Sequence, residues 1–121
     1  MLKDSLYHII AIDHTDSVIH AVLELDAQHE IFTGHFPDHP VLPGACMVQM
    51  IKEVFESAMG TPYRLEKADN LKFLTIVDPQ QTSTLQLELN YIIEELLAKV
   101  NAELVTDEGI AFKFQGSFVC E

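Results

Sequence analysis

The residues best suited to chemistry lie in one short stretch, residues 34–44. It contains His35 and, after it, three prolines within seven positions. Proline fixes φ and removes a backbone donor, so we predict a stiff loop and neither a helix nor an inner strand. A rigid loop holds a side chain in one place, and imidazole titrates near neutral pH. His35 is therefore the first candidate for acid or base chemistry.

A helix is predicted to leave this loop at Ala45 and to run to about Met59, with Gly60 as its stop signal. Pro43 occupies a favoured first-turn position, and Gly44 stands at the turn. The first half of the segment is mostly apolar, so we expect it to be buried. The start of a helix presents unpaired N–H groups and partial positive charge, which stabilise a carbonyl oxygen that gains negative charge.

Alternating apolar and polar residues, and at 71–77 a run rich in β-forming residues, predict strands on both sides of this helix. Two precede it, at residues 5–11 and 18–25, with a turn at 13–16; four follow it, at 71–77, 85–91, 98–104 and 110–118, with turns at 94–96 and 107–109. The connections are too short for crossover helices, so the sheet must be mostly antiparallel. The predicted fold is α+β, an antiparallel sheet of about five to six strands wrapped around one central buried helix, in a single domain over residues 1–121.

Composition excludes several classes of function. A net charge of −12, from 19 acidic and 7 basic residues, argues against binding to nucleic acid or to an anionic membrane surface. No apolar run is long enough to span a bilayer, and no signal-type stretch follows the N-terminus, so we expect a cytoplasmic protein.

Neither a metal nor a cofactor is expected. Cys46 and Cys120 have no spacing typical of zinc, haem or a disulfide framework, and we interpret both as reduced thiols. His35 and His39 have a spacing that suits a metal only on a helix, which the prolines exclude. There is no phosphate-binding glycine loop and no serine nucleophile elbow. Cys46 stands near the helix start, where a thiol is readily activated, but a packed core cysteine is the simpler interpretation.

The sequence Gly34-His35-Phe36-Pro37, followed by Pro40-Val41-Leu42-Pro43-Gly44 and a buried helix, resembles the signature of the hotdog-fold 3-hydroxyacyl-(acyl-carrier-protein) dehydratases of fatty acid synthesis. The resemblance is close from about residue 32 to residue 60 and weaker from 67 to 79. It implies a hotdog fold, an acyl thioester substrate bound to acyl carrier protein, no cofactor, and a homodimer or higher homo-oligomer.

The resemblance also implies roles for particular residues. His35 would remove the C2 proton of a 3-hydroxyacyl thioester while the carbonyl of Val41 holds its ring, and the Gly44 N–H would hold the thioester oxygen. The C2 proton becomes acidic only if that oxygen is stabilised as charge develops. The residues that would line the substrate site are Phe36, Val41, Pro43 and Ala45.

Position 49 departs from the family pattern. The family's acid is an Asp or Glu of the neighbouring subunit, fourteen residues after the histidine, and here that residue is Gln49. An amide has no titratable proton, so acid catalysis of about 10² to 10⁴-fold would be missing. Glu53 stands one helical turn later, where many family members carry Gln, so the two side chains look exchanged. Glu53 would serve as a relocated acid, directly or through one water, or it is a solvated carboxylate where the helix becomes amphipathic.

Three hypotheses follow from His35 beside Gln49. The first is a dehydratase in which Glu53 or water replaces the missing acid. The second is a subunit that binds acyl chains without converting them. The third is a heterodimer, in which His35 meets the Glu of a related subunit. A hotdog thioesterase is a weaker fourth reading, because hydrolysis needs a carboxylate-activated water that Gln49 cannot supply.

A docking site for acyl carrier protein is suggested by the basic residues. Carrier proteins are acidic, so a chain of net charge −12 needs a local basic spot to attract one. Arg64, Lys67 and Lys72 place three of the seven basic residues within nine positions. Chance clustering of so few charges is the alternative explanation.

Overall fold

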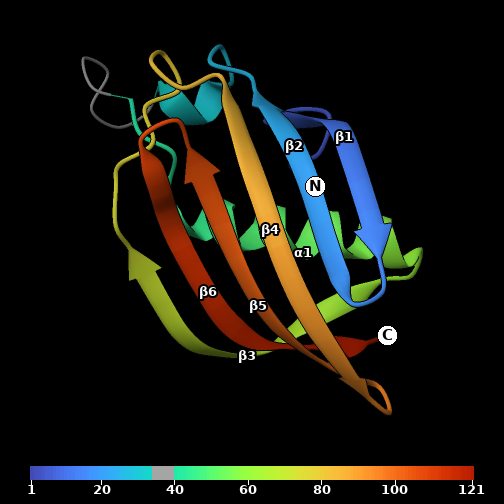
Figure 1. The fold of residues 1–121 in the computed structure, drawn as a ribbon. Helices are drawn as coiled ribbons and strands as arrows, with labels where there is room; N and C mark the ends of the chain where they lie inside the picture. Colours follow the sequence, from blue (N-terminus) through green and yellow to red (C-terminus); the bar gives the residue numbers. More distant parts are fainter. Residues whose placement is uncertain (34–39) are drawn as a thin grey trace.

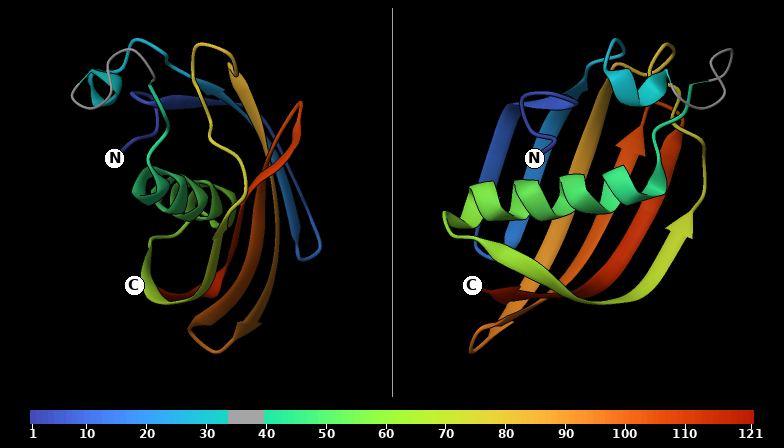
Figure 2. Two further views of the ribbon diagram at one scale, coloured as in Figure 1. Left: turned by 90° about the vertical axis from the view of Figure 1, so that its left-hand side faces the viewer. Right: turned by 180° about the vertical axis from the view of Figure 1, so that it is seen from behind.

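The computed structural model describes residues 1–33 and 40–121. In this part of the chain, one long helix, α1 (Gly44–Met59), crosses one face of a curved six-stranded sheet, as Figures 1 and 2 show. The strands are β1 (Tyr7–Thr15), β2 (Val18–Leu25), β3 (Tyr63–Phe73), β4 (Thr84–Glu94), β5 (Leu97–Thr106) and β6 (Gly109–Cys120), and a short 3-10 helix, η1 (Glu30–Phe32), follows β2. The predicted α+β architecture, a sheet wrapped around one buried helix, is confirmed.

The order of the strands across the sheet is β1-β2-β4-β5-β6-β3, and every neighbouring pair is antiparallel. The last three strands form a meander joined by tight turns, at the places predicted from the sequence. β3 therefore lies at one edge, beside β6, and β1 lies at the other. β3 begins just after the end of α1 and runs back toward the helix start, so the start of α1 and the end of β3 come close together (Figure 2).

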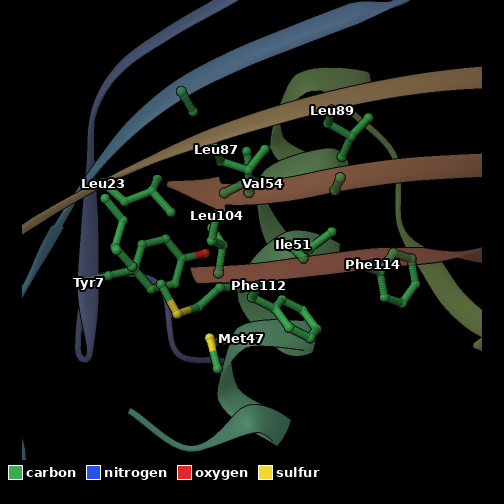
Figure 3. Packing of buried hydrophobic residues seen from close by; sticks show 14 of the residues in the cluster. Tyr7, Leu23, Met47, Ile51, Val54, Leu87, Leu89, Leu104, Phe112 and Phe114 are labelled. Carbon is green, nitrogen blue, oxygen red and sulfur yellow. The ribbon is translucent and has the colours of Figure 1, made fainter. Parts of the chain in front are cut away.

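The core lies between α1 and the inward face of the sheet. Ile51, Val54 and Phe55 of α1 are fully buried, and the alternate residues of β2 and β4 facing them are buried as well. Figure 3 shows side chains of the helix and of the sheet in this cluster. The alternation predicted for β2 is confirmed by the burial of Ile19, Ala21, Leu23 and Leu25.

The ends of α1 differ slightly from the prediction. The helix begins at Gly44, and Pro43 is its N-cap with φ −64° and ψ 147°, so this proline is outside the first turn. The extended ψ of Pro43 shows that this residue still has the loop conformation, so the first turn of the helix starts after it. The predicted stop at Gly60 is confirmed: this residue has φ 73° and its N–H donates to the Glu56 carbonyl.

The first strand is longer than predicted. β1 continues to Thr15, and the turn is at Asp16 and Ser17, with Asp16 at φ 55°. The predicted turn at residues 13–16 was wrong, because this polar segment pairs with β2, for example Asp13 with His20. Backbone pairing at a sheet edge does not require buried side chains.

The strand predicted at residues 71–77 is also displaced. β3 runs from Tyr63 to Phe73, and only Tyr63 in it is buried. The prediction rested on the β-forming residues at 71–77, whereas two register shifts, at Leu65/Lys67 and Ala68/Asn70, leave the earlier part of β3 without a regular alternation. Residues 74–77 instead pass the start of α1, where the Leu42 N–H donates to the Val77 carbonyl at 2.8 Å.

Candidate functional site

An apolar pocket lies at the start of α1. Its volume is about 200 Å³, and the residues that line it are Val41, Leu42, Gly44, Met47 and residues 73–77. The hydrogen bond between Leu42 and Val77 holds the two walls together. The pocket therefore joins the end of the predicted histidine loop to the segment that follows β3.

The start of α1 brings to this pocket a backbone donor that has no acceptor among the described residues. The N–H groups of Cys46 and Met47 donate to the Pro43 carbonyl at 3.1 and 3.2 Å, and the cap residue, Pro43, supplies no side-chain hydrogen bond. Among the described residues, the Gly44 N–H has no acceptor. A helix N-terminus also carries partial positive charge, so this donor suits an oxygen that becomes negative during a reaction.

Phe73 closes one side of the pocket. A Cβ added to Gly44 would lie 2.6 Å from a ring carbon of Phe73, so only glycine fits at this position without movement of the ring. The Phe73 ring stacks on Phe112, with ring centroids 4.7 Å apart, yet Phe73 as a residue is 56% exposed. Sequence reasoning did not identify Phe73, because its contact with Gly44 depends on the path of the chain after β3.

The predicted site residues are placed only in part. His35 and Phe36 lie outside the described residues, and so does the predicted contact between the His35 ring and Val41. Val41 and Gly44 line the pocket, whereas Pro43 and Ala45 are not among its lining residues. The catalytic and binding roles inferred for these residues stay predictions.

Glu53 is buried and fully hydrogen-bonded. Its side chain is on α1, and the residue is 1% exposed. Oε1 accepts from the Lys3 N–H at 2.8 Å and from the Tyr7 hydroxyl at 3.0 Å. Oε2 accepts from the Leu2 N–H at 2.9 Å and from the Gln49 amide at 2.7 Å. Glu53 thus ties the N-terminal residues to the helix, and its reading as a solvated surface carboxylate was wrong.

The environment of Glu53 keeps it ionised. Burial alone raises its pKa, but the hydrogen bonds from Gln49, from the N-terminal backbone and from Tyr7 outweigh burial, so the pKa lies below its usual value. Burial and the negative charge of Glu53 raise the pKa of Tyr7, which stays a donor. A carboxylate held by four donors has no proton to give, so this geometry favours a structural Glu53 over a relocated acid.

Cys46 is a core residue. It is 7% exposed, it forms no disulfide, and burial raises its pKa. The interpretation of Cys46 as a packed cysteine is confirmed, and an activated thiol is not supported. Within residues 1–33 and 40–121, no three His, Cys, Asp or Glu side chains converge as metal ligands do. In the same ranges, no helix combines the length and apolar character that crossing a bilayer requires.

The three predicted docking residues do not form one patch. Arg64, Lys67 and Lys72 all lie on β3, where the first and the last are eight positions apart. At about 3.3 Å per residue, this separation is roughly 26 Å. Lys67 also forms an ion pair with Asp69 at 3.3 Å. The predicted cluster therefore divides into single charges along an edge strand.

Lys72 has a basic neighbour that the sequence analysis missed. It is the register partner of Lys113 on β6, on the face of the sheet opposite to Phe112. Neither lysine takes part in any ion pair among the described residues, although Glu103 of β5 is the register partner of Lys113 on its other side. Two like charges directly opposite each other destabilise a sheet, so this pair is a local excess of positive charge.

A family model described as ApeI-like, ApeI dehydratase, matches residues 11–109. The chain belongs to the ApeI-like dehydratase family. Curated relatives named 3-hydroxyacyl-(acyl-carrier-protein) dehydratase FabZ are similar to it. The one from Bacillus cereus (strain AH820) is 28% identical over 103 residues, covering 75% of this chain and 72% of the relative. The one from Oenococcus oeni is 30% identical over 96 residues, covering 69% and 68%.

Solved structures confirm the hotdog fold of this ApeI-like chain. The dehydratase heterocomplex ApeI:P from Xenorhabdus doucetiae matches with a TM-score of 0.73 at 20% identity, covering 92% of this chain and 96% of that one. The thioesterase HI1161 from Haemophilus influenzae matches with a TM-score of 0.67 at 15% identity, covering 97% and 80%. The resemblance inferred from the sequence around His35 is confirmed at the level of family and fold.

Proposed function

We propose that this chain is a subunit of a dehydratase that converts 3-hydroxyacyl thioesters on acyl carrier protein into trans-2-enoyl thioesters. Membership of a dehydratase family supports the reaction, and the names of the FabZ relatives support the class of substrate. The observation that carries the proposal is the apolar pocket at the start of α1, lined in part by Gly44, whose N–H has no acceptor among the described residues. An acyl chain fits such a pocket, and its thioester oxygen suits that donor.

The proposed reaction needs one base and one acid. His35 removes the C2 proton, the Gly44 N–H stabilises the thioester oxygen, the C2=C3 double bond forms, and the C3–O bond breaks. The departing hydroxyl must gain a proton to leave as water. Gln49 has none to give, and Glu53 is held as an acceptor by four donors.

We therefore propose that the acid comes from another chain, a related hotdog subunit with Asp or Glu at the position of Gln49. A homodimer would place two amides, and no acid, at this position. The likeness to the ApeI:P heterocomplex supports an assembly of two different subunits, since that complex is itself a dehydratase heterocomplex. The free edge of β3 is the surface that we assign to the partner.

The β3 edge has the properties of an interface. Among the described residues no strand pairs with its outer side, and unpaired backbone groups at an edge favour association with another strand. Several large apolar side chains of β3 and of the segment after it are exposed in the single chain. They are Leu65, Leu71, Phe73, Leu74 and Ile76.

Hydrolysis of thioesters is the competing activity, because thioesterases are among the structures with this fold. Hydrolysis needs a carboxylate that activates water. On α1, Gln49 is an amide, and the Glu53 carboxylate is already saturated with donors. Dehydration with a partner's acid is therefore the better supported reaction.

The experiment uses the purified chain and a 3-hydroxyacyl thioester loaded on acyl carrier protein. We expect the wild-type chain alone to bind the substrate, with a rise in Tm, and to form enoyl product at least 100-fold more slowly than an ordinary family member. His35→Ala should abolish the remaining turnover. No binding and no product from wild type would refute the proposal, and free acyl carboxylate as the product would favour a thioesterase.

A further inference from the structure

Only one orientation of the Gln49 amide is compatible with its hydrogen-bond partner, Glu53. Its Nε2 lies 2.7 Å from Oε2 of Glu53. An ionised carboxylate accepts hydrogen bonds and donates none, so the amide nitrogen, and not the oxygen, must face Glu53. The carbonyl oxygen of Gln49 is consequently turned away from Glu53.

Glu53 is itself unable to move away from Gln49. The backbone N–H groups of Leu2 and Lys3 and the Tyr7 hydroxyl fill its remaining acceptor sites. Two of these three partners are backbone donors, which cannot turn into acceptors when a side chain rotates. Glu53 is 1% exposed, so water does not compete for its oxygens. The Glu53 carboxylate therefore keeps one position, and its hydrogen bond sets the orientation of the Gln49 amide.

We propose that Glu53 is a positioning residue that fixes the Gln49 carbonyl oxygen as an outward hydrogen-bond acceptor, and that this acceptor selects acyl thioesters that carry a 3-hydroxyl group. The inference rests on the function proposed above. In a mixed dimer Gln49 lies at the second acyl site, which lacks an acid. There the substrate hydroxyl donates to the Gln49 oxygen, and the thioester is bound without being converted.

An acceptor at position 49 distinguishes substrate from product. A 3-hydroxyacyl chain offers an O–H to it, whereas an enoyl or saturated chain offers only carbon. Gln49 is half-buried, so a bound chain that covers its oxygen without offering a donor costs the free energy of removing water from that oxygen, and chains without the hydroxyl are bound less tightly. The exchange of Glu and Gln between positions 49 and 53 thus turns a position that gives a proton into one that recognises a hydroxyl.

The test compares two probes in which an amide replaces the thioester, so that neither is converted. They are the pantetheine amides of 3-hydroxyoctanoate and of octanoate. Their dissociation constants are measured by calorimetry on the full chain. Wild type should bind the hydroxy probe about 10-fold more tightly. Gln49→Leu should reduce the ratio to near 1, and Glu53→Gln should reduce it to about 2, because an amide at position 53 permits both orientations of Gln49.

The ratio separates positioning from general stability. If the role of Glu53 is merely structural, Glu53→Gln should weaken the binding of both probes equally and leave the ratio of their dissociation constants unchanged. That result would overturn the inference. Tyr7→Phe is the matched control, since it removes one hydrogen bond of Glu53 on the side away from Gln49. This variant should lower Tm by a few degrees and keep the ratio of wild type.

Two further outcomes complete the test. If Glu53→Gln does not fold, the exchange of the Gln49 side-chain NH₂ protons with solvent in wild type decides: slow exchange supports the fixed amide, and exchange as fast as that of an exposed glutamine overturns it. Equal affinity of wild type for both probes overturns this inference and leaves the proposed function intact. Failure of wild type to bind either probe refutes both.

Discussion

The Gln49 amide donates to the Glu53 carboxylate at 2.7 Å, one helical turn apart on α1. This contact unites the two residues that depart from the pattern of the dehydratase family. It is one of four hydrogen bonds that keep the buried Glu53 anionic, and the Gln49 amide has no titratable proton. The absence of a titratable group at position 49 is thus coupled to the hydrogen bonds of Glu53, and the loss of a catalytic acid there stays a prediction.

Introducing a carboxyl at position 49 should restore an acid. In Gln49→Glu/Glu53→Gln the amide at position 53 donates to the new carboxyl, so the pair regains the family order. Turnover of 3-hydroxyacyl-carrier protein by this chain alone should rise about 10² to 10⁴-fold, as measured by enoyl formation. Gln49→Leu is the control and should show no gain. A double variant as slow as wild type would mean that position 49 does not reach the substrate.

Removing the charge of Glu53 should destabilise the fold. Glu53→Gln replaces a carboxylate that has four donors, and an amide cannot accept from all of them, so the free energy of unfolding should fall by roughly 2–4 kcal/mol at pH 7. Urea denaturation measures this change. Tyr7→Phe, which deletes one donor, should cost only about 1 kcal/mol.

The pH dependence of stability should follow the lowered pKa of Glu53. Because the folded-state pKa lies below the unfolded value of about 4.5, Glu53 contributes stability that is present above that pH and is lost as pH falls through the folded-state value. The difference in unfolding free energy between wild type and Glu53→Gln should therefore shrink below pH 4.5. A difference that stays constant down to pH 3 would contradict an ionised Glu53.

Gly44→Ala should damage the pocket more than the fold. The new methyl would lie 2.6 Å from the Phe73 ring, and displacement of substrate near the reacting centre should lower kcat/KM by about 10 to 100-fold. Helix propensity favours alanine by up to about 1 kcal/mol, so Tm should change little. Adding Phe73→Ala should restore space and part of the activity. Gly60→Ala, at φ 73°, should instead lower stability by about 1 kcal/mol and leave kcat/KM unchanged.

Carrier docking should depend on Lys72 and Lys113, which are register partners. The double change of both lysines to Glu should raise KM for carrier-bound substrate about tenfold and leave KM for an acyl-pantetheine substrate unchanged. Lys52→Glu/Lys99→Glu, on α1 and β5 and away from β3, alters the net charge equally and is the control. If the two double variants raise KM equally, the change is due to long-range charge, and Lys72 and Lys113 are not a docking site.

The sequence predicted most of the fold because half-buried elements carry a clear period. β2, β4, β5, β6 and the extent of α1 followed from alternation and from the stop at Gly60. The end of β1 and most of β3 were misplaced, since edge strands with exposed side chains carry no such period.

The candidate site was predictable only where it depends on local spacing. The spacing of Gln49 from His35 in the sequence predicted a missing acid, which stays a prediction. The burial of Glu53 was not predictable, because its partners at residues 2, 3 and 7 are brought to the helix by tertiary structure. Phe73 and Lys113 were missed for the same reason, since both act through neighbours on other elements.

The most direct test of the central claim mixes two forms of this chain, each with an incomplete site. Wild type supplies His35 and no acid, and His35→Ala/Gln49→Glu/Glu53→Gln supplies an acid and no base. The two are unfolded together and refolded, and enoyl formation from 3-hydroxyacyl-carrier protein is measured. We predict that the mixture is at least 100-fold more active than either form refolded alone. A mixture no more active than the sum of its components, or a wild type fully active by itself, would contradict a site completed by a second subunit's acid.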